Sequence, residues 1–274
     1  MDPTVITSRN NSLLRRAREV RDGKVAEWIF IEGLRLCEEA LRSGLQVETV
    51  IFSEQLVRKE KAAKLLRELA TICNKVVSVS ESLLATISYT KTPPGIIALA
   101  MRPKSQPDSL LPDHNQPPLL VVMHRLNNPV NVGAILRSAE AAGATGAVAT
   151  KHTTDPFSAK ALRGSMGSAF RLPMWIGPDY SEVLNWCVKR NIHTVCAELN
   201  AATLYTDINW RSSKALIVGP EATGLTPKEI SAADATVRIP MQGEVESLNV
   251  AVAAGVLLYE AARQRRSGQR DPSG

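Results

Sequence analysis

The 274-residue sequence predicts an α/β protein whose second part is a mostly parallel sheet with helices on both faces. Two observations carry this prediction. Short apolar runs alternate with segments of helical periodicity, which is the order of α/β folds. In the second part, runs such as Leu119 to Met123 and Ala215 to Val218 contain no polar residue, as in strands that are buried on both faces.

The first part is predicted to be a small α/β domain over residues 1–104. It begins with an expected helix from Ser12 to Asp22, in which Leu13, Ala17 and Val20 share one face. The expected strands are Glu27 to Ile31, Val47 to Phe52, Lys75 to Val79 and Ile96 to Met101. The expected helices between them are Leu34 to Arg42, Lys59 to Ile72 and Glu81 to Ile87.

Five prolines stand among polar residues between Arg102 and Pro118, and residues 105–118 are therefore predicted as a linker. A second domain is expected over residues 119–266, followed by a polar tail over 267–274. Its expected strands are Leu119 to Met123, Gly146 to Thr150, one near Met174, His193 to Ala197, Ala215 to Val218 and Thr236 to Ile239. Its expected helices are Asn131 to Ala142, one near Pro156 to Gly164, Ser181 to Arg190 and Leu248 to Gln264.

Composition limits the class of protein. The chain is 44% hydrophobic and 22% charged, which is typical of a soluble globular protein. Apolar runs such as Gly95 to Met101 are far shorter than the roughly 20 residues of a membrane span. The N-terminus lacks the pattern of a secretory signal, so a cytoplasmic location is expected. Four cysteines without Cys-x-x-Cys spacing and four scattered histidines predict reduced thiols and no metal site.

The positive charge is concentrated in the first part. The formal net charge is +6. Residues 1–104 hold 17 Lys and Arg against 12 Asp and Glu, whereas residues 105–274 hold 16 against 15. Four arginines at the start of the chain are candidate contacts to a polyanion: Arg9, Arg15, Arg16 and Arg18. A solvated helix face and a phosphate-binding surface both fit this pattern.

Familiar nucleotide and hydrolase motifs are absent from the second part. No Gly-x-Gly-x-x-Gly lies between a strand and a helix. The segment 219–226 has the glycine spacing of a phosphate loop, but Leu225 stands where such a loop has its lysine, so a triphosphate would face Glu221 without a cation. The segment 163–167 only partly imitates a Gly-x-Ser-x-Gly elbow, because Arg163 replaces the first glycine.

Three polar turns remain, each of which leaves an expected strand. The first is Asn127-Asn-Pro-Val-Asn-Val-Gly-Ala-Ile-Leu-Arg137, the second is Gly219 to Thr226, and the third runs from Ile239 to Val250. Together, in this order and spacing, they resemble the three signature motifs of the SpoU (TrmH) family of RNA ribose 2′-O-methyltransferases, which are members of the SPOUT superfamily. The resemblance extends from about Leu119 to Glu260.

The resemblance implies a fold, a cofactor and partners. It implies a trefoil-knotted domain that binds S-adenosylmethionine, a homodimer whose active site draws on both chains, and RNA as substrate. The first domain more weakly resembles the small ribosomal-protein-like module that many family members use to hold RNA. Where the family more often has Asn-Glu-Gly in its second motif, this chain has Pro220-Glu221-Ala222, which leaves the local loop geometry open.

The resemblance also assigns residues, which are named here by role. The catalytic candidates are Asn131, Arg137, Glu221, Ser247 and Asn249. The cofactor-binding candidates are Gly219, Glu221, Gly224, Ile239, Met241 and Leu248. The RNA-binding candidates are Arg9, Arg15, Arg16 and Arg18 of the first domain, together with Arg163 and Ser165. The last two stand in a segment that resembles an intermediate family segment.

Several of these residues have structural alternatives. Asn131 and Ser247 are each suited to cap a helix, Glu221 to lie in the first turn of a helix, and the two glycines to make ordinary turns. A guanidinium is always protonated in proteins, so we expect Arg137 to bind the acceptor phosphate and to stabilise the developing alkoxide rather than to act as a base.

The function expected from these observations is methyl transfer from S-adenosylmethionine to a ribose 2′-hydroxyl of structured RNA. Ribosomal RNA is favoured over transfer RNA because of the first domain. Two alternatives stay open: a catalytically idle RNA-binding protein and methylation of a base instead of a ribose.

Overall fold

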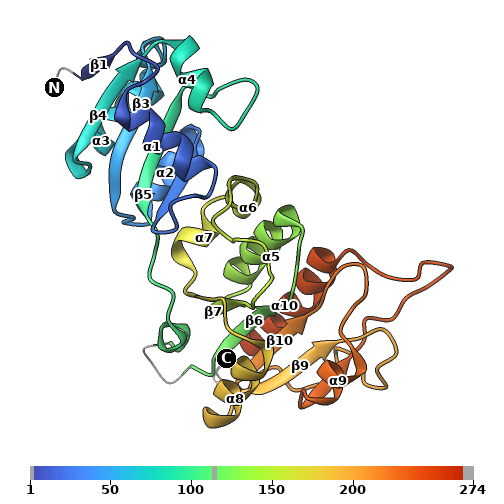
Figure 1. The fold of residues 1–274 in the computed structure, drawn as a ribbon. Coiled ribbons are helices and arrows are strands. Elements are labelled where there is room, and N and C mark those ends of the chain that lie inside the picture. The colour runs from blue at the N-terminus through green and yellow to red at the C-terminus, as the bar shows by residue number, and fades with distance from the viewer. Residues whose placement is uncertain (1–2, 113–115, 268–274) are drawn as a thin grey trace. The chain divides into compact units, whose positions relative to one another are not determined.

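A computed structural model describes residues 3–112 and 116–267, and the chain divides into two compact units (Figure 1). The first unit contains the chain up to Pro103 together with Phe157–Arg171. The second contains Lys104–Pro156 and the chain from Leu172 onward. Residues 113–115 of the expected linker and 268–274 of the expected tail lie outside the described residues.

The first unit is built on a mixed five-stranded sheet in the order β1-β4-β3-β5-β2. β4 is parallel to both β1 and β3, whereas β5 is antiparallel to β3 and β2. The strands are β1 (Thr4–Ile6), β2 (Trp28–Glu32), β3 (Val47–Ser53), β4 (Lys75–Val79) and β5 (Ile96–Met101). The helices are α1 (Ser12–Arg21), α2 (Leu34–Arg42), α3 (Glu60–Ile72), α4 (Glu81–Ile87), α6 (Ala159–Ser165) and α7 (Ser168–Arg171), with a 3-10 turn η1 (Leu56–Arg58).

Helix α1 is amphipathic and packs one face into the core of this unit. Asn11 caps its start by accepting a hydrogen bond from the Leu13 backbone. Ala17 and Val20 are buried as predicted, but the third buried residue is Leu14, and Leu13 is only partly covered. Among the basic side chains of α1, Arg15 and Arg16 are exposed, whereas Arg18 and Arg21 are partly covered.

The segment Phe157–Arg171 is held in the first unit by apolar and charged contacts. Phe157 and Phe170 are buried. The Arg102 guanidinium lies 4.9 Å from the centre of the Phe157 ring, and Arg171 Nη1 lies 2.6 Å from a carboxylate oxygen of Glu39. These contacts explain why the segment belongs to this unit although both of its flanks belong to the other.

The second unit is built on a six-stranded sheet in the order β11-β9-β10-β6-β7-β8, in which every pairing is parallel. This confirms the α/β fold class and the parallel sheet predicted from the apolar runs. The strands are β6 (Leu119–Met123), β7 (Gly146–Ala149), β8 (Met174–Ile176), β9 (His193–Ala197), β10 (Lys214–Val218) and β11 (Ala235–Val237). The helices are α5 (Pro129–Ala141), α8 (Tyr180–Lys189), α9 (Pro227–Ser231) and α10 (Val250–Ser267), with a 3-10 turn η2 (Pro107–Leu110).

Helices cover both faces of this sheet. On one face, α8 packs on the sheet through Val183, Trp186 and Cys187, and Leu110 of η2 is fully buried in the same cluster. On the other face lie α5 and α10, which pack side by side in Figure 1. Among the described residues, no helix is long and apolar enough to cross a membrane. The knotted path of the chain stays a prediction.

Candidate functional site

A pocket of about 750 Å³ opens in the second unit at the carboxyl ends of its central strands. It is lined by the turn after β6, the residues that follow β9 and β10, the segment after β11 and the start of α10. Ligands of parallel α/β sheets bind at this end of the strands, because the connecting loops converge there. The pocket is therefore the candidate functional site.

The three polar turns singled out in the sequence meet at this pocket. All six predicted cofactor-binding residues line it, namely Gly219, Glu221, Gly224, Ile239, Met241 and Leu248. Four of the five predicted catalytic residues also line it, namely Asn131, Glu221, Ser247 and Asn249. The remaining one, Arg137, does not.

A chain of side-chain hydrogen bonds joins the three turns. Asn131 Nδ2 donates to Glu221 Oε1, and Asn249 Nδ2 donates to Asn131 Oδ1, both over 3.2 Å. A carboxylate only accepts hydrogen bonds, so Asn131 must turn its amide nitrogen to Glu221 and its oxygen to Asn249. Asn131 is buried, and it is therefore held in one orientation between the other two motifs.

The side chains that cap α5 and α10 are not the ones that the sequence suggested. Asn128, not Asn131, caps α5, since its side chain accepts from the Val130 backbone. Asn249, not Ser247, accepts from the backbone of the first turn of α10, at Ala251 and Val252. Asn249 can do both jobs because its amide nitrogen binds Asn131 while its oxygen caps the helix.

The two glycines of the second turn, Gly219 and Gly224, are needed for different structural reasons. A Cβ on Gly219 would lie 2.8 Å from Leu225 Cγ, so only glycine lets Leu225 pack against the end of β10. Gly224 has φ +63°, the left-handed backbone that glycine adopts without a steric cost. Both glycines shape the loop that forms one wall of the pocket.

The pocket has an acidic lining. Among the described residues that line it there is no lysine, arginine or histidine, and two carboxylates, Glu198 and Glu221, are present. Sequence reasoning missed Glu198 and its neighbour Leu199, which follow β9 and belong to no motif. Glu198 Oε2 accepts from the backbone of Asn200 over 2.7 Å, which fixes the carboxylate on its turn. Such a pocket favours a cationic ligand over a phosphate.

Arg137 lies outside the pocket of its own chain for a geometric reason. It follows Asn131 by six positions, and at roughly 100° per residue this places it on a different side of α5. Its side chain is exposed, and it shares a face with Val130, which precedes it by about two turns and is 55% exposed.

The predicted RNA contacts lie in the first unit. Arg9, Arg15, Arg16 and Arg163 are exposed, and Arg18 is partly covered. Arg16 lies 4.2 Å from the centre of the Trp28 ring and Arg163 lies 5.0 Å from that of the exposed Tyr89. Ser165 is fully buried and donates to the Leu162 carbonyl, so the described conformation gives it no access to RNA.

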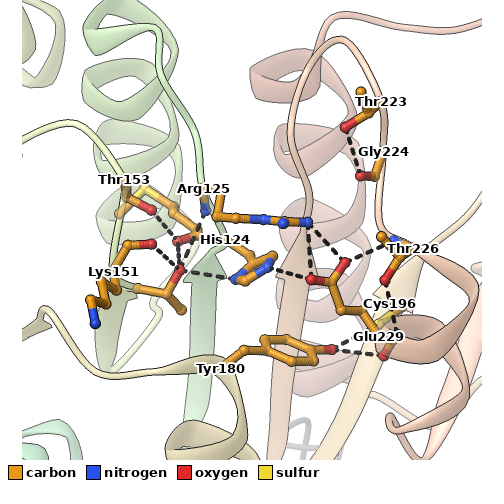
Figure 2. A network of polar contacts seen from close by, with 12 residues as sticks. His124, Arg125, Lys151, Thr153, Tyr180, Cys196, Thr223, Gly224, Thr226 and Glu229 are labelled. Carbon is orange, nitrogen blue, oxygen red and sulfur yellow. Dashed lines mark hydrogen bonds and ion pairs between the residues drawn. The ribbon is translucent and has the colours of Figure 1, made fainter.

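A second polar cluster lies at the base of the pocket loops (Figure 2). His124 follows β6, and its Nε2 lies 3.1 Å from the Glu229 carboxylate of α9. Burial lowers the pKa of His124 in spite of this carboxylate. Burial by itself would raise the pKa of Glu229, but hydrogen bonds from Thr226 and His124 outweigh it, and the pKa is lowered.

Comparison with protein families gives two matches. Residues 118–259 match the SpoU rRNA methylase family, and residues 13–98 match the MRM3-like substrate binding domain. The first match contains the pocket and all three polar turns. The second contains the basic helix α1 and most of the strands of the first unit.

Individual relatives are similar over nearly the whole chain or over about half of it. A 23S rRNA uridine 2′-O-methyltransferase of Streptomyces viridochromogenes is 32% identical, over 96% of this chain and 93% of the relative. A 23S rRNA guanosine 2′-O-methyltransferase of Xylella fastidiosa is 41% identical over 54% of this chain and 59% of its own. Among solved structures, the SpoU methyltransferase AviRb of S. viridochromogenes in complex with AdoMet superimposes with a TM-score of 0.85 at 30% identity, covering 95% of this chain and all of the other.

Proposed function

The chain belongs to the SpoU rRNA methylase family, and we propose that its pocket binds S-adenosylmethionine (AdoMet) for methyl transfer to a ribose 2′-hydroxyl of ribosomal RNA. One observation carries the proposal. The hydrogen-bonded chain from Glu221 through Asn131 to Asn249 joins all three motifs at the wall of a pocket whose described lining contains no cation. The names of the relatives support ribosomal RNA over transfer RNA.

The chemistry of the lining fits AdoMet. A volume of about 750 Å³ is in the range of small-molecule sites, and the apolar side chains of Ile239, Met241 and Leu248 offer a surface for an adenine ring. When bound, AdoMet supplies a methyl group activated by a sulfonium cation. Glu198 and Glu221 favour that positive charge, whereas a lysine or arginine in the lining would oppose it.

The chain's own polar residues orient the reactants. Asn131 has its amide locked by two partners, and Asn249 is fixed by the helix that it caps. Such preorganised groups hold an acceptor hydroxyl in line without a cost at the moment of reaction. Arg137 stays protonated, so it binds the acceptor phosphate and stabilises the developing alkoxide, while the proton leaves to water or to a phosphate oxygen.

A homodimer explains how Arg137 reaches a site. Arg137 and Val130 share the exposed face of α5, and the neighbouring α10 exposes Val252 and Tyr259. Exposed apolar side chains of this size on two adjacent helices are suited to pairing with a second copy. In the proposed dimer Arg137 of one chain serves the pocket of its partner.

The first unit is proposed to hold the RNA. Arg15 and Arg16 are exposed on α1, and Arg163 stacks on the exposed ring of Tyr89. Phosphate contacts from arginines and stacking on aromatic rings are the usual means of binding RNA. A cytoplasmic location, where ribosomal RNA is accessible, is part of the proposal.

Two measurements test it. Titration calorimetry with S-adenosylhomocysteine should show binding that Asn249→Ala and Glu221→Ala weaken. Mapping of 2′-O-methyl groups across total RNA, with and without the gene, should show one or a few sites lost from ribosomal RNA. Loss of a methylated base with every ribose unchanged would contradict the proposal, as would a protein that does not bind S-adenosylhomocysteine.

A further inference from the structure

Glu229 is the centre of a polar cluster that the proposed chemistry does not use. Its carboxylate accepts hydrogen bonds from His124 Nε2 over 3.1 Å, from the Thr226 backbone over 2.8 Å and from Arg125 Nη2 over 2.9 Å. The Thr226 hydroxyl in turn accepts from the Glu229 backbone, which completes a capping box at the start of α9. Figure 2 shows these donors converging on one carboxylate from two sides.

The donors and acceptors of the cluster form one consistent set. Because a carboxylate only accepts, Nε2 of His124 must carry a proton, and in the neutral ring Nδ1 is then an acceptor. Nδ1 lies 2.9 Å from the Thr150 hydroxyl, which donates to it and accepts from the Arg125 backbone over 3.3 Å. A neutral His124 therefore completes the set.

The cluster ties together the bases of two pocket loops. His124 and Arg125 begin the turn that leads to Asn131, and Thr226 ends the loop that starts at Gly219. At the pocket itself, these two loops are linked by the bond between Asn131 and Glu221. Glu229 thus sets the spacing of the loops at one end while Glu221 and Asn131 join them at the other.

Arg125 holds a backbone conformation that disfavours its own side chain. Its φ is +52°, in the left-handed region where a Cβ crowds the following carbonyl. Glycine would adopt this turn more readily. The side chain is partly exposed, and ion pairs of exposed groups contribute little to stability. Stability alone therefore gives no reason for an arginine at this position.

We propose that Arg125, Glu229 and His124 are positioning residues, which fix the distance between the first and second motif loops so that the pocket fits AdoMet. The inference rests on the proposed function of the pocket. The three side chains touch neither AdoMet nor RNA in this proposal, and they act through Asn131 and the loop 219–225.

The variant Arg125→Gly separates positioning from stability. It removes the contact with Glu229 but relieves the left-handed strain, so the melting temperature should stay within about 2 °C of the wild type. The dissociation constant for S-adenosylhomocysteine should rise by about tenfold. This is a smaller effect than the roughly hundredfold loss of reaction rate that a 1 Å misplacement of reacting groups causes. Asn191→Gly is the matched control, because Asn191 has φ +53° in the same unit, after α8, away from the pocket.

The variant Glu229→Gln provides an independent test. Glutamine still closes the capping box, so α9 stays capped, but it has no charge for Arg125. The affinity of the pocket for S-adenosylhomocysteine should therefore fall again. Glu182→Gln, in the first turn of α8, is its control. Wild-type affinity in both Arg125→Gly and Glu229→Gln would overturn the proposal, and so would a loss of affinity in Arg125→Gly that is accompanied by a fall in melting temperature of more than about 2 °C. Failure of the proposed function is distinct, since the wild type itself would then not bind S-adenosylhomocysteine.

Discussion

The two units of the chain differ in net charge, and the difference is larger when the chain is divided by structure than when it is divided along the sequence. Divided by structure, the first unit holds 19 Lys and Arg against 12 Asp and Glu, a net charge of +7, and the second holds 14 against 15, a net charge of −1. The segment Phe157–Arg171 adds three cations and no acid to the first unit.

This difference suits two ligands of opposite charge. RNA is a polyanion, and its affinity depends on neutralised phosphates, which favours the basic unit. AdoMet carries a sulfonium cation, and the residues described at the pocket of the second unit include two carboxylates and no cation. A single mixed surface would attract one ligand at the expense of the other.

Asn131→Ala should abolish the chemistry of the second unit while leaving the first unit intact. It removes the buried amide that joins Glu221 to Asn249, so methyl transfer to ribosomal RNA should fall by at least about 100-fold. Incorporation of labelled methyl groups measures this, and RNA affinity should be unchanged. Asn185→Ala, on the exposed side of α8, is the control. An activity within a few-fold of the wild type would show that the amide chain is structural.

Mixing two inactive variants should restore activity if the proposed dimer is correct. Arg137→Ala leaves the pocket complete, and Asn249→Ala leaves Arg137 intact, so a mixed dimer has one site with both residues. Equal mixing should restore about a quarter of the wild-type activity, since half of randomly assorted dimers are mixed. Asn131→Ala mixed with Asn249→Ala is the control, because both changes damage the same pocket and no recovery is expected. Equal recovery in both mixtures, or in neither, would rule out a shared site.

Replacing Arg15 and Arg16 together by glutamine should weaken RNA binding about tenfold and leave S-adenosylhomocysteine binding unchanged. Two lost phosphate contacts should also reduce the slope of log affinity against log salt by about 1.4 to 1.8. Filter binding over a series of salt concentrations measures both effects. The matched pair Lys189→Gln and Arg211→Gln, exposed in the second unit, should have little effect. If both pairs weaken RNA equally, the difference in charge does not mark the binding surface.

Acid should destabilise the second unit through His124 and Glu229. The pKa of His124 is lowered by burial, so the unfolded chain takes up its proton first, and stability falls as the pH drops below 6.5. The pKa of Glu229 is lowered too. Its contribution to stability is therefore present above pH 4.5 and is lost as the pH falls through the pKa of the folded protein.

Each loss of about 1 kcal/mol should lower the melting temperature by roughly 2 to 4 °C. His124→Gln should flatten the decline just below pH 6.5, whereas His193→Gln, at an exposed position, should not. Parallel curves for all three proteins would show that His124 does not titrate between the folded and unfolded states.

Most of the fold could be predicted because periodicity is a local property. Strands such as β6 and β9 and helices such as α4 have the bounds expected from their apolar runs. Among the described residues, three strands or helices were missed besides the two 3-10 turns, and one of them is the four-residue helix α7. β1 has only three residues, Thr4–Ile6, and is too short to produce an apolar run. The short α9 is marked instead by its capping box, Thr226 and Glu229, a signal that was present in the sequence and was overlooked.

The site was predictable where residues stand in motifs and not elsewhere. The six cofactor candidates all line the pocket, but Glu198 reaches it only because β9 lies beside β10 in the sheet. Pairing of strands is not a local property, and no spacing in the sequence encodes it. Arg137 lies outside the pocket that Asn131 lines, because residues six positions apart on a helix point in different directions.

The segment Phe157–Arg171 also bears on how such a protein can be divided. The chain passes between the units three times, after Pro103, after Pro156 and after Arg171. A cut in the segment 104–118 would therefore leave the first unit attached through the packing of α6 and α7. For the same reason, a chimaera that takes its RNA-holding unit from a relative has to receive two separate stretches of sequence together. Boundaries drawn along the sequence alone would separate partners that fold together.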